Sequence, residues 1–151
     1  MTTSESQTKQ RLPWYTRLTI AAMGVVLISM LGVAVWLKPS PRGFGTHTQL
    51  GLQPCTFTQL ARIRCPSCGM TTSWAHTVRG QLFSAVKANS GGTLLALLAL
   101  VGGPWLLLSG VLGKWFCGRP NEWLVVALAA FVVIVTLTDW GIRLGMGPLG
   151  R

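Results

Sequence analysis

Three cysteines stand close together in the chain, at Cys55, Cys65 and Cys68. The last two form a C-x-x-C pair, Cys65-Pro-Ser-Cys68. Thiols at this spacing suit three kinds of chemistry: a structural disulfide, a redox-active dithiol, and metal ligation by thiolates. Covalent attachment of a c-type haem is excluded, because that motif requires a histidine after the second cysteine and Gly69 stands there.

The residues leave these three interpretations open. In a structural role, two of the three cysteines pair and staple the loop that carries them. In a redox role, Cys65 and Cys68 form the exchanging pair, Cys55 is the resolving thiol, and the N-terminus of a following helix favours the thiolate form. In a metal site, zinc binds all three cysteines and a histidine, with His76 as the assigned fourth ligand and His47 as the other candidate.

Three long apolar runs must position these residues, at 18–37, 91–113 and 123–140; the first two carry no charge and the third carries only Asp139, near its end. Each is long enough to cross a hydrocarbon core of about 30 Å as a helix. Of the 151 residues, 50% are hydrophobic and 11% are charged, whereas about 25% are charged in a typical soluble domain. Tryptophans flank the runs, as in the aromatic belts of membrane proteins. The sequence predicts an all-α integral membrane protein with three transmembrane helices.

Other segments connect the runs and carry the cysteines. They are a polar tail at 1–17, a Cys-rich loop at 38–69, short interfacial helices at 70–90, a connection at 114–122 and a C-terminal tail at 141–151. The first interfacial helix is expected to begin near residue 70, with Thr71 or Thr72 as its N-cap, and to end near Gly80. Asn89 stands before the second run, where its side chain either caps that helix or bonds the loop.

The order of the spans separates the cysteines. Three crossings place Cys117 on the membrane face opposite the other three cysteines, so a zinc site made of all four cysteines of one chain is excluded. In the second span, Gly102-Gly103-Pro104 predicts a kink or a close contact with a neighbouring helix. At the end of the third span, Asp139 and Arg143 are four residues apart and are expected to pair on one helix face.

The charge of the chain points to a lipid bilayer as its partner. The sequence has 13 Lys and Arg against 3 Asp and Glu, a formal net charge of +10. These basic residues flank the apolar runs, where they contact lipid head groups. No basic face of usable size is left for nucleic acid. A proton relay would need acidic or histidine side chains deep within the spans, and the sequence has none there.

A longer motif surrounds the C-x-x-C pair. It reads Cys65-Pro-Ser-Cys68-Gly69-Met70-Thr71-Thr72-Ser73, then Val78-Arg79-Gly80-Gln81-Leu82-Phe83-Ser84-Ala85, and then Asn89. It resembles the motif of the small bacterial membrane proteins grouped as domain of unknown function 2752: an upstream cysteine, C-P-x-C-G-[LMS]-T-R, a short helix, G-[DNQ]-[LF]-x-x-A and an asparagine. The matching positions are Cys55, Cys65, Pro66, Cys68, Gly69, Thr71, Gly80 and Asn89. Thr72 stands where that family usually has arginine.

The resemblance implies a protein of the bacterial cytoplasmic (inner) membrane, with its N-terminus inside and the Cys loop outside. It implies no reaction, because the family has no established activity. We therefore expect a non-enzymatic scaffold or accessory subunit, without a cofactor, whose extracytoplasmic loop is stapled by a disulfide. Its expected partners are another membrane protein or further copies of itself. The alternatives are a membrane thiol–disulfide oxidoreductase using Cys65 and Cys68, and a metal-binding membrane module that holds zinc.

Overall fold

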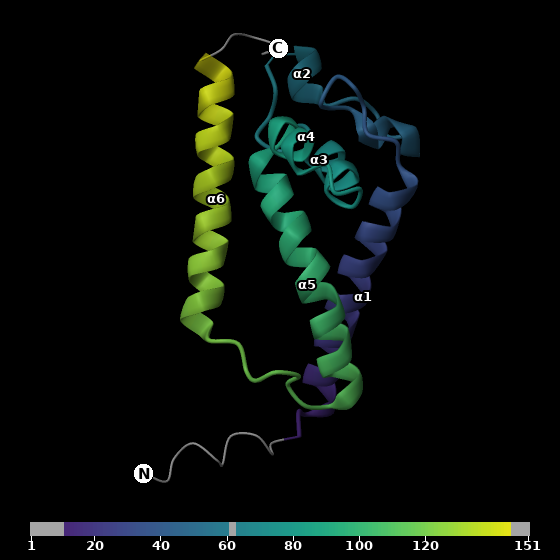
Figure 1. Cartoon of the computed structure of the whole chain (residues 1–151), viewed down its shortest axis with the longest axis vertical. Coiled ribbons are helices and arrows are strands. Elements are labelled where there is room, and N and C mark those ends of the chain that lie inside the picture. Colours follow the sequence, from purple (N-terminus) through teal and green to yellow (C-terminus); the bar gives the residue numbers. More distant parts are fainter. Residues whose placement is uncertain (1–10, 61–62, 146–151) are drawn as a thin grey trace.

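Three long helices run the length of the molecule (Figure 1). The computed structural model describes residues 11–60 and 63–145. The long helices are α1 (Trp14–Trp36), α5 (Ser90–Leu112) and α6 (Glu122–Gly145), and each is long and apolar enough to cross a membrane. The part of the chain that the structure describes contains no strand. The predicted all-α fold with three membrane-spanning helices is therefore confirmed, and its apolar outer surface suits a lipid bilayer.

Four short helices between α1 and α5 form a cap at one end of the long helices. They are η2 (Thr46–Leu50), α2 (Thr56–Leu60), α3 (Met70–Thr77) and α4 (Leu82–Ala88). We call residues 38–60 and 63–89 the cap. Figure 1 shows the cap beside the C-terminal end of α1 and the N-terminal end of α5, whereas the connection from α5 to α6 lies at the opposite end. Cys117 lies in that connection, so it is separated from the cysteines of the cap.

Helices α1 and α5 pack closely because glycines bring their backbones together. A Cβ atom on Gly24 of α1 would lie 2.6 Å from the backbone nitrogen of Leu107 on α5. A Cβ atom on Gly103 of α5 would lie 3.2 Å from Cγ1 of Ile28 on α1. Gly102-Gly103-Pro104 thus marks a close helix contact, which is one of the two outcomes predicted for it. A larger side chain at Gly24 would force the two helices apart.

Helix α3, which corresponds to the first predicted interfacial helix, begins differently from the prediction. Its N-cap is Gly69 and its first residue is Met70, so the expectation of Thr71 or Thr72 as N-cap is wrong. Gly69 has φ +89°, and a Cβ atom there would collide with the carbonyl oxygens of Ala88 and Gly43. Only glycine suits this position, since it tolerates left-handed backbone and leaves room for both carbonyls.

The hydroxyl of Thr72 has a different partner, which no local pattern indicates. Thr72 is fully buried, and its Oγ1 lies 2.7 Å from Oγ1 of Thr46 in η2. This hydrogen bond joins the start of α3 to the loop that follows α1. The side chain at this motif position therefore helps to pack the cap.

Arg79 joins the cap to the end of α1. Its guanidinium donates to the carbonyl oxygens of Ala34 at 3.2 Å, Val35 at 2.8 Å and Leu37 at 2.8 Å. The last carbonyls of a helix have no partner within that helix and carry partial negative charge. Arg79 satisfies three carbonyls at the end of α1 at once, and it fixes the cap against the membrane-spanning helix.

We expect Arg79→Gln to destabilise the protein by about 2 kcal/mol, because hydrogen bonds to a charged donor are stronger than neutral ones and this donor is partly exposed. The melting temperature in detergent micelles, followed by tryptophan fluorescence, measures the loss. The matched control is Arg119→Gln, since Arg119 forms only an exposed ion pair with Glu122, and such pairs contribute little. Equal melting temperatures for the two variants would contradict the role of Arg79.

Candidate metal centre

The three cysteines of the cap come from two segments that the fold brings together. Cys55 stands directly before α2, and Cys68 stands one residue before the N-cap of α3. The C-x-x-C pair forms a tight turn, in which the backbone N–H of Cys68 donates to the carbonyl of Cys65 at 3.0 Å. A second such bond joins Met70 to Ser67 at 3.0 Å. The turn holds both of its thiols on the same side as Cys55.

The sulfur atoms of these three residues form a compact triangle. Sγ of Cys65 lies 3.1 Å from Sγ of Cys68 and 3.5 Å from Sγ of Cys55. All three sulfurs lie within 4.8 Å of one another. A disulfide bond is about 2.05 Å long, so no pair here is at bonding distance. Three thiolates of a tetrahedral zinc site lie about 3.8 Å apart, given Zn–S bonds of about 2.3 Å, and the observed triangle is close to that size.

Asn89 fixes the C-x-x-C turn to the start of α5. This side chain is buried, with 1% of its surface exposed. Its Nδ2 donates to the carbonyls of Pro66 at 3.0 Å and Cys68 at 3.2 Å, while its Oδ1 accepts from the backbone N–H of Gly92 at 2.7 Å. Asn89 therefore caps α5 and bonds the loop, which are the two roles that its position predicted.

Two arginines surround the turn with positive charge. Arg143 of α6 donates to the carbonyl of Cys68 at 3.3 Å and forms an ion pair with Asp139, which confirms the predicted pairing of these two residues. The guanidinium of Arg64 lies over the ring of Phe44, 4.3 Å from its centre. Cations beside a thiol favour its thiolate form, which is the form that binds metals and attacks disulfides.

The pKa of Arg64 reflects its burial and the charges near it. Burial lowers the pKa of Arg64, and the positive charge of Arg143 lowers it further, whereas negative charge on Cys68 acts to raise it. The interaction is mutual, so a charged Arg64 stabilises a thiolate at Cys68. The sequence could have indicated Arg64 as a residue of this site, because it directly precedes Cys65. No sequence signal places Arg143 here, because its approach depends on how α6 packs.

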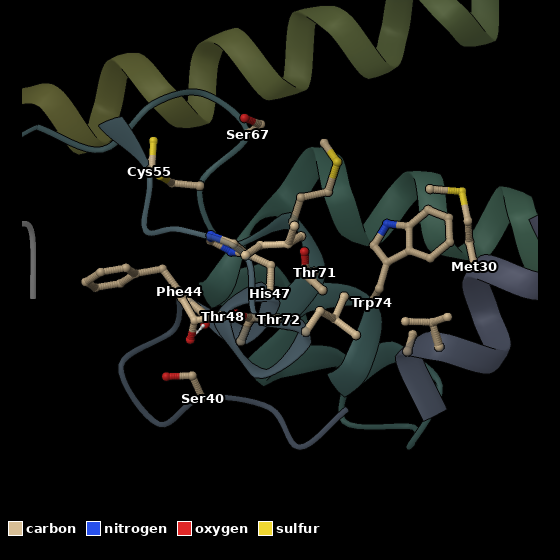
Figure 2. A pocket seen from close by; sticks show the side chains of 18 of the residues that line it. Met30, Ser40, Phe44, His47, Thr48, Cys55, Ser67, Thr71, Thr72 and Trp74 are labelled. Atoms are coloured by element: carbon tan, nitrogen blue, oxygen red, sulfur yellow. Dashed lines mark hydrogen bonds between the residues drawn. The ribbon is translucent and has the colours of Figure 1, made fainter. Parts of the chain in front are cut away.

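The two histidines occupy different places relative to the three sulfurs. His76 stands near the end of α3, where its Nδ1 lies 2.7 Å from Oε1 of Gln81. Among the described residues, neither histidine belongs to the group of ligand atoms that lie within 4.8 Å of one another. His47 lines the same cavity as the three cysteines, and His76 does not. Figure 2 shows the imidazole of His47 among the labelled residues of this cavity, which include Cys55.

The other two positions of the motif have separate roles. Thr71 lies in the first turn of α3 and lines the cavity beside the cysteines. Gly80 follows the end of α3 with φ +72°, and its N–H donates to the carbonyl of Thr77 at 2.9 Å. Gly80 thus serves the turn between α3 and α4 and is not brought to the sulfurs.

The cavity has a volume of about 1070 Å³. Its walls come from the C-terminal half of α1, the loop that includes η2, the cysteine turn and the first residues of α3. Two of the cysteines, Cys55 and Cys65, are partly buried, whereas Cys68 is 8% exposed. The sulfur triangle is therefore reached from the cavity, which combines soft ligands with a largely apolar wall.

The cysteine cluster lies in a segment of the chain that is similar to a known family. Residues 55–103 match the model of a family described as protein of unknown function (DUF2752). The match begins at Cys55 and covers the C-x-x-C turn, α3, α4 and part of α5, and it confirms the resemblance seen in the sequence. No curated protein and no solved structure matches the chain.

Proposed function

We propose that this chain, whose residues 55–103 match the DUF2752 family model, is a metal-binding membrane module whose ligands are Cys55, Cys65 and Cys68. One observation carries the proposal: the three sulfurs lie within 4.8 Å of one another. A disulfide would account for only two of the three clustered thiols, whereas a metal ion can be bound by all three. Soft thiolate ligands favour zinc or copper(I) over hard cations, and zinc is the ion we propose.

The charges around the triangle support this assignment. Three thiolates and one Zn²⁺ together carry a single negative charge, which is costly to bury unless it is paired. The negative charge of Cys68 is felt by Arg64, and Arg143 donates to the carbonyl of Cys68. Asp139 balances the charge of Arg143. Arg64 is thus the cation that remains to neutralise the loaded site.

For the fourth ligand, we propose His47 in place of His76. Zinc sites in proteins are usually tetrahedral, and a fourth position without a protein ligand takes water or substrate. His47 lines the cavity that the three cysteines share, whereas His76 does not. His76 is already engaged with Gln81 on another face of α3.

For the orientation, we propose that the N-terminus lies inside and the cap outside, in the bacterial cytoplasmic membrane. The family resemblance supports this orientation, and the three crossings separate the cap from Cys117. An impermeant maleimide applied to intact cells should then leave Cys117 unlabelled, and it should label this exposed thiol once the membrane is permeabilised. Labelling of Cys117 in intact cells would invert the orientation.

Metal analysis of the protein purified without chelators tests the function. We expect one zinc ion per chain by native mass spectrometry and by elemental analysis. Iodoacetamide should modify Cys117 in the folded protein, and should modify the other three cysteines only after a chelator removes the ion. Cys117 is the internal control because it is exposed and outside the cluster. Three reactive cap thiols and no bound metal, even after addition of zinc or copper(I), would contradict the proposal.

The contacts of Cys65 favour a second candidate, thiol–disulfide exchange with a disulfide of a partner protein. Cys65 contacts both other sulfurs, so it can pass a bond from one to the other. Exchange with the partner's disulfide would first join Cys65 to Cys68 and reduce the partner's disulfide to two thiols. The Cys55 thiolate would then attack Sγ of Cys65, which forms a Cys55–Cys65 bond and releases Cys68 as a thiolate. A purified protein that lacks metal and is lighter by two hydrogens would favour this candidate over zinc.

A further inference from the structure

The cavity beneath the cap lies at the depth of a membrane leaflet. Its α1 wall consists of side chains between Val25 and Ala34, in the C-terminal half of that helix. At 1.5 Å per residue this stretch covers about 15 Å, which is half of a hydrocarbon core of about 30 Å. Val26 and Met30 are 56% and 52% exposed, so this wall also faces the lipid. The cavity is therefore accessible to molecules dissolved in the bilayer.

Trp74 offers a hydrogen-bond donor inside this cavity. The residue is 8% exposed, and it lines the cavity beside Met30. Its Nε1 is buried and has no hydrogen-bond partner among the described residues. In Figure 2 the nitrogen of the indole ring faces Thr71 and not Met30. Burying an unpaired N–H group is unfavourable, so the free donor indicates that a bound molecule supplies an acceptor.

Apart from the three cysteines, the polar lining of the cavity is cationic or neutral. Arg42 lies on the rim and is exposed, and Ser40 and His47 stand in the same loop. None of the described lining residues is acidic. This charge distribution favours a ligand with an anionic head group, because a guanidinium binds phosphate well. A neutral apolar molecule would gain nothing from Arg42.

We propose that the cavity binds one phospholipid of the surrounding bilayer. Its acyl chain lies against the α1 wall at Val26 and Met30, and an ester carbonyl accepts a hydrogen bond from Nε1 of Trp74. Its phosphate lies at Arg42. Ester groups of a phospholipid stand between the hydrocarbon and the head group, and in Figure 2 Trp74 lies between Met30 of α1 and the loop residues His47 and Phe44. This site does not depend on the metal centre.

Lipid retention tests the proposal on the full chain. The protein is extracted in a mild detergent from vesicles of phosphatidylcholine and phosphatidylglycerol and analysed by native mass spectrometry, where we expect one bound phospholipid per chain. Trp74→Phe and Arg42→Gln should each reduce retention about tenfold, which is the effect expected of one lost hydrogen bond or ion contact of this kind. Arg42→Gln is informative even if Trp74→Phe unfolds, because Arg42 is exposed.

Two control variants remove equivalent groups elsewhere. Trp36→Phe deletes an indole that is 71% exposed, and Arg119→Gln deletes a cation at the opposite end of the molecule. Both should retain lipid as the unchanged protein does. Lipid bound equally by all four variants, no retained lipid, or a retained isoprenoid quinone would each overturn the proposal. Retention by a metal-free Cys65→Ser protein would show that the two sites are separate, whereas its loss would overturn their independence.

Discussion

Replacing Cys65 with serine is expected to abolish stoichiometric metal binding. Cys65 provides the central sulfur of the triangle, in contact with both Cys55 and Cys68. A serine hydroxyl is a hard, protonated ligand that cannot replace a thiolate on zinc. Loss of a residue that only supports a metal ligand typically lowers the affinity by about 10–100-fold. Loss of a ligand itself should cost more, so the zinc affinity of Cys65→Ser should fall by more than about 100-fold. Competition with a chromophoric chelator measures the change.

Matched variants separate ligation from a general disturbance of the fold. Cys55→Ser and Cys68→Ser should behave like Cys65→Ser, whereas Cys117→Ser should keep full affinity because Cys117 lies in the α5–α6 connection. His47→Ala should weaken binding and His76→Ala should leave it unchanged. Added zinc should also raise the melting temperature of the unchanged protein, because a ligand of the folded state stabilises it. Full zinc occupancy in Cys65→Ser would refute the assigned site.

The second large effect is expected for Asn89→Ala, with a loss of about 3 kcal/mol in the free energy of unfolding. An N-cap contributes about 1 kcal/mol. The substitution would also remove the hydrogen bonds to the carbonyls of Pro66 and Cys68, of which the second would keep Arg143 as a donor. Each lost bond of this kind costs about 1 kcal/mol. The C-x-x-C turn would then no longer be held against α5. Thermal unfolding in micelles and the alkylation rate of Cys65 should both report the change.

Asn121 provides a matched control for Asn89. Its side chain accepts a backbone N–H at the start of α6, from Trp123 at 2.9 Å, but it is exposed and lies at the end of the molecule opposite the three cysteines of the cap. Asn121→Ala should therefore cost about 1 kcal/mol and leave cysteine reactivity unchanged. Asn89→Asp keeps the oxygen that accepts from Gly92 but loses the amide group that donates to the carbonyls of Pro66 and Cys68. The free energy of unfolding of this variant should therefore also fall. An Asn89→Ala protein as stable as Asn121→Ala would show that the bonds to the turn contribute little.

Local sequence patterns predicted the features that depend on local spacing. Run length and the absence of charge were sufficient for the three spanning helices, because a bilayer imposes a fixed length on any helix that crosses it. The pairing of Asp139 with Arg143 follows from the helical repeat. The roles of Asn89 follow from its place before an apolar run. Each of these features involves residues within one element or at its boundary.

The surroundings of the cysteines depend on contacts between distant segments, and the sequence did not predict them. Arg143 reaches Cys68 only because α6 packs beside the cap. The hydrogen bond of Thr72 to Thr46 and the unpaired donor of Trp74 likewise arise from tertiary packing. His76 was assigned as a ligand by its proximity in sequence, yet α3 directs it to Gln81. The spacing of the cysteines in the sequence was sufficient to identify the thiols, whereas the residues around them are set by the packing of distant helices and loops.

The attachment of α6 to the cap has a mechanical consequence. Three side chains near the C-terminal end of this helix bind the cap and the start of α5: Asp139 accepts from the N–H of Ser90, Trp140 donates to the carbonyl of Arg64, and Arg143 donates to that of Cys68. Two of these carbonyls flank the C-x-x-C turn. Helix α6 is thus attached to the cysteine turn at its C-terminal end. A change in the shape of that turn would therefore act directly on α6, whose other end lies at the opposite end of the molecule (Figure 1).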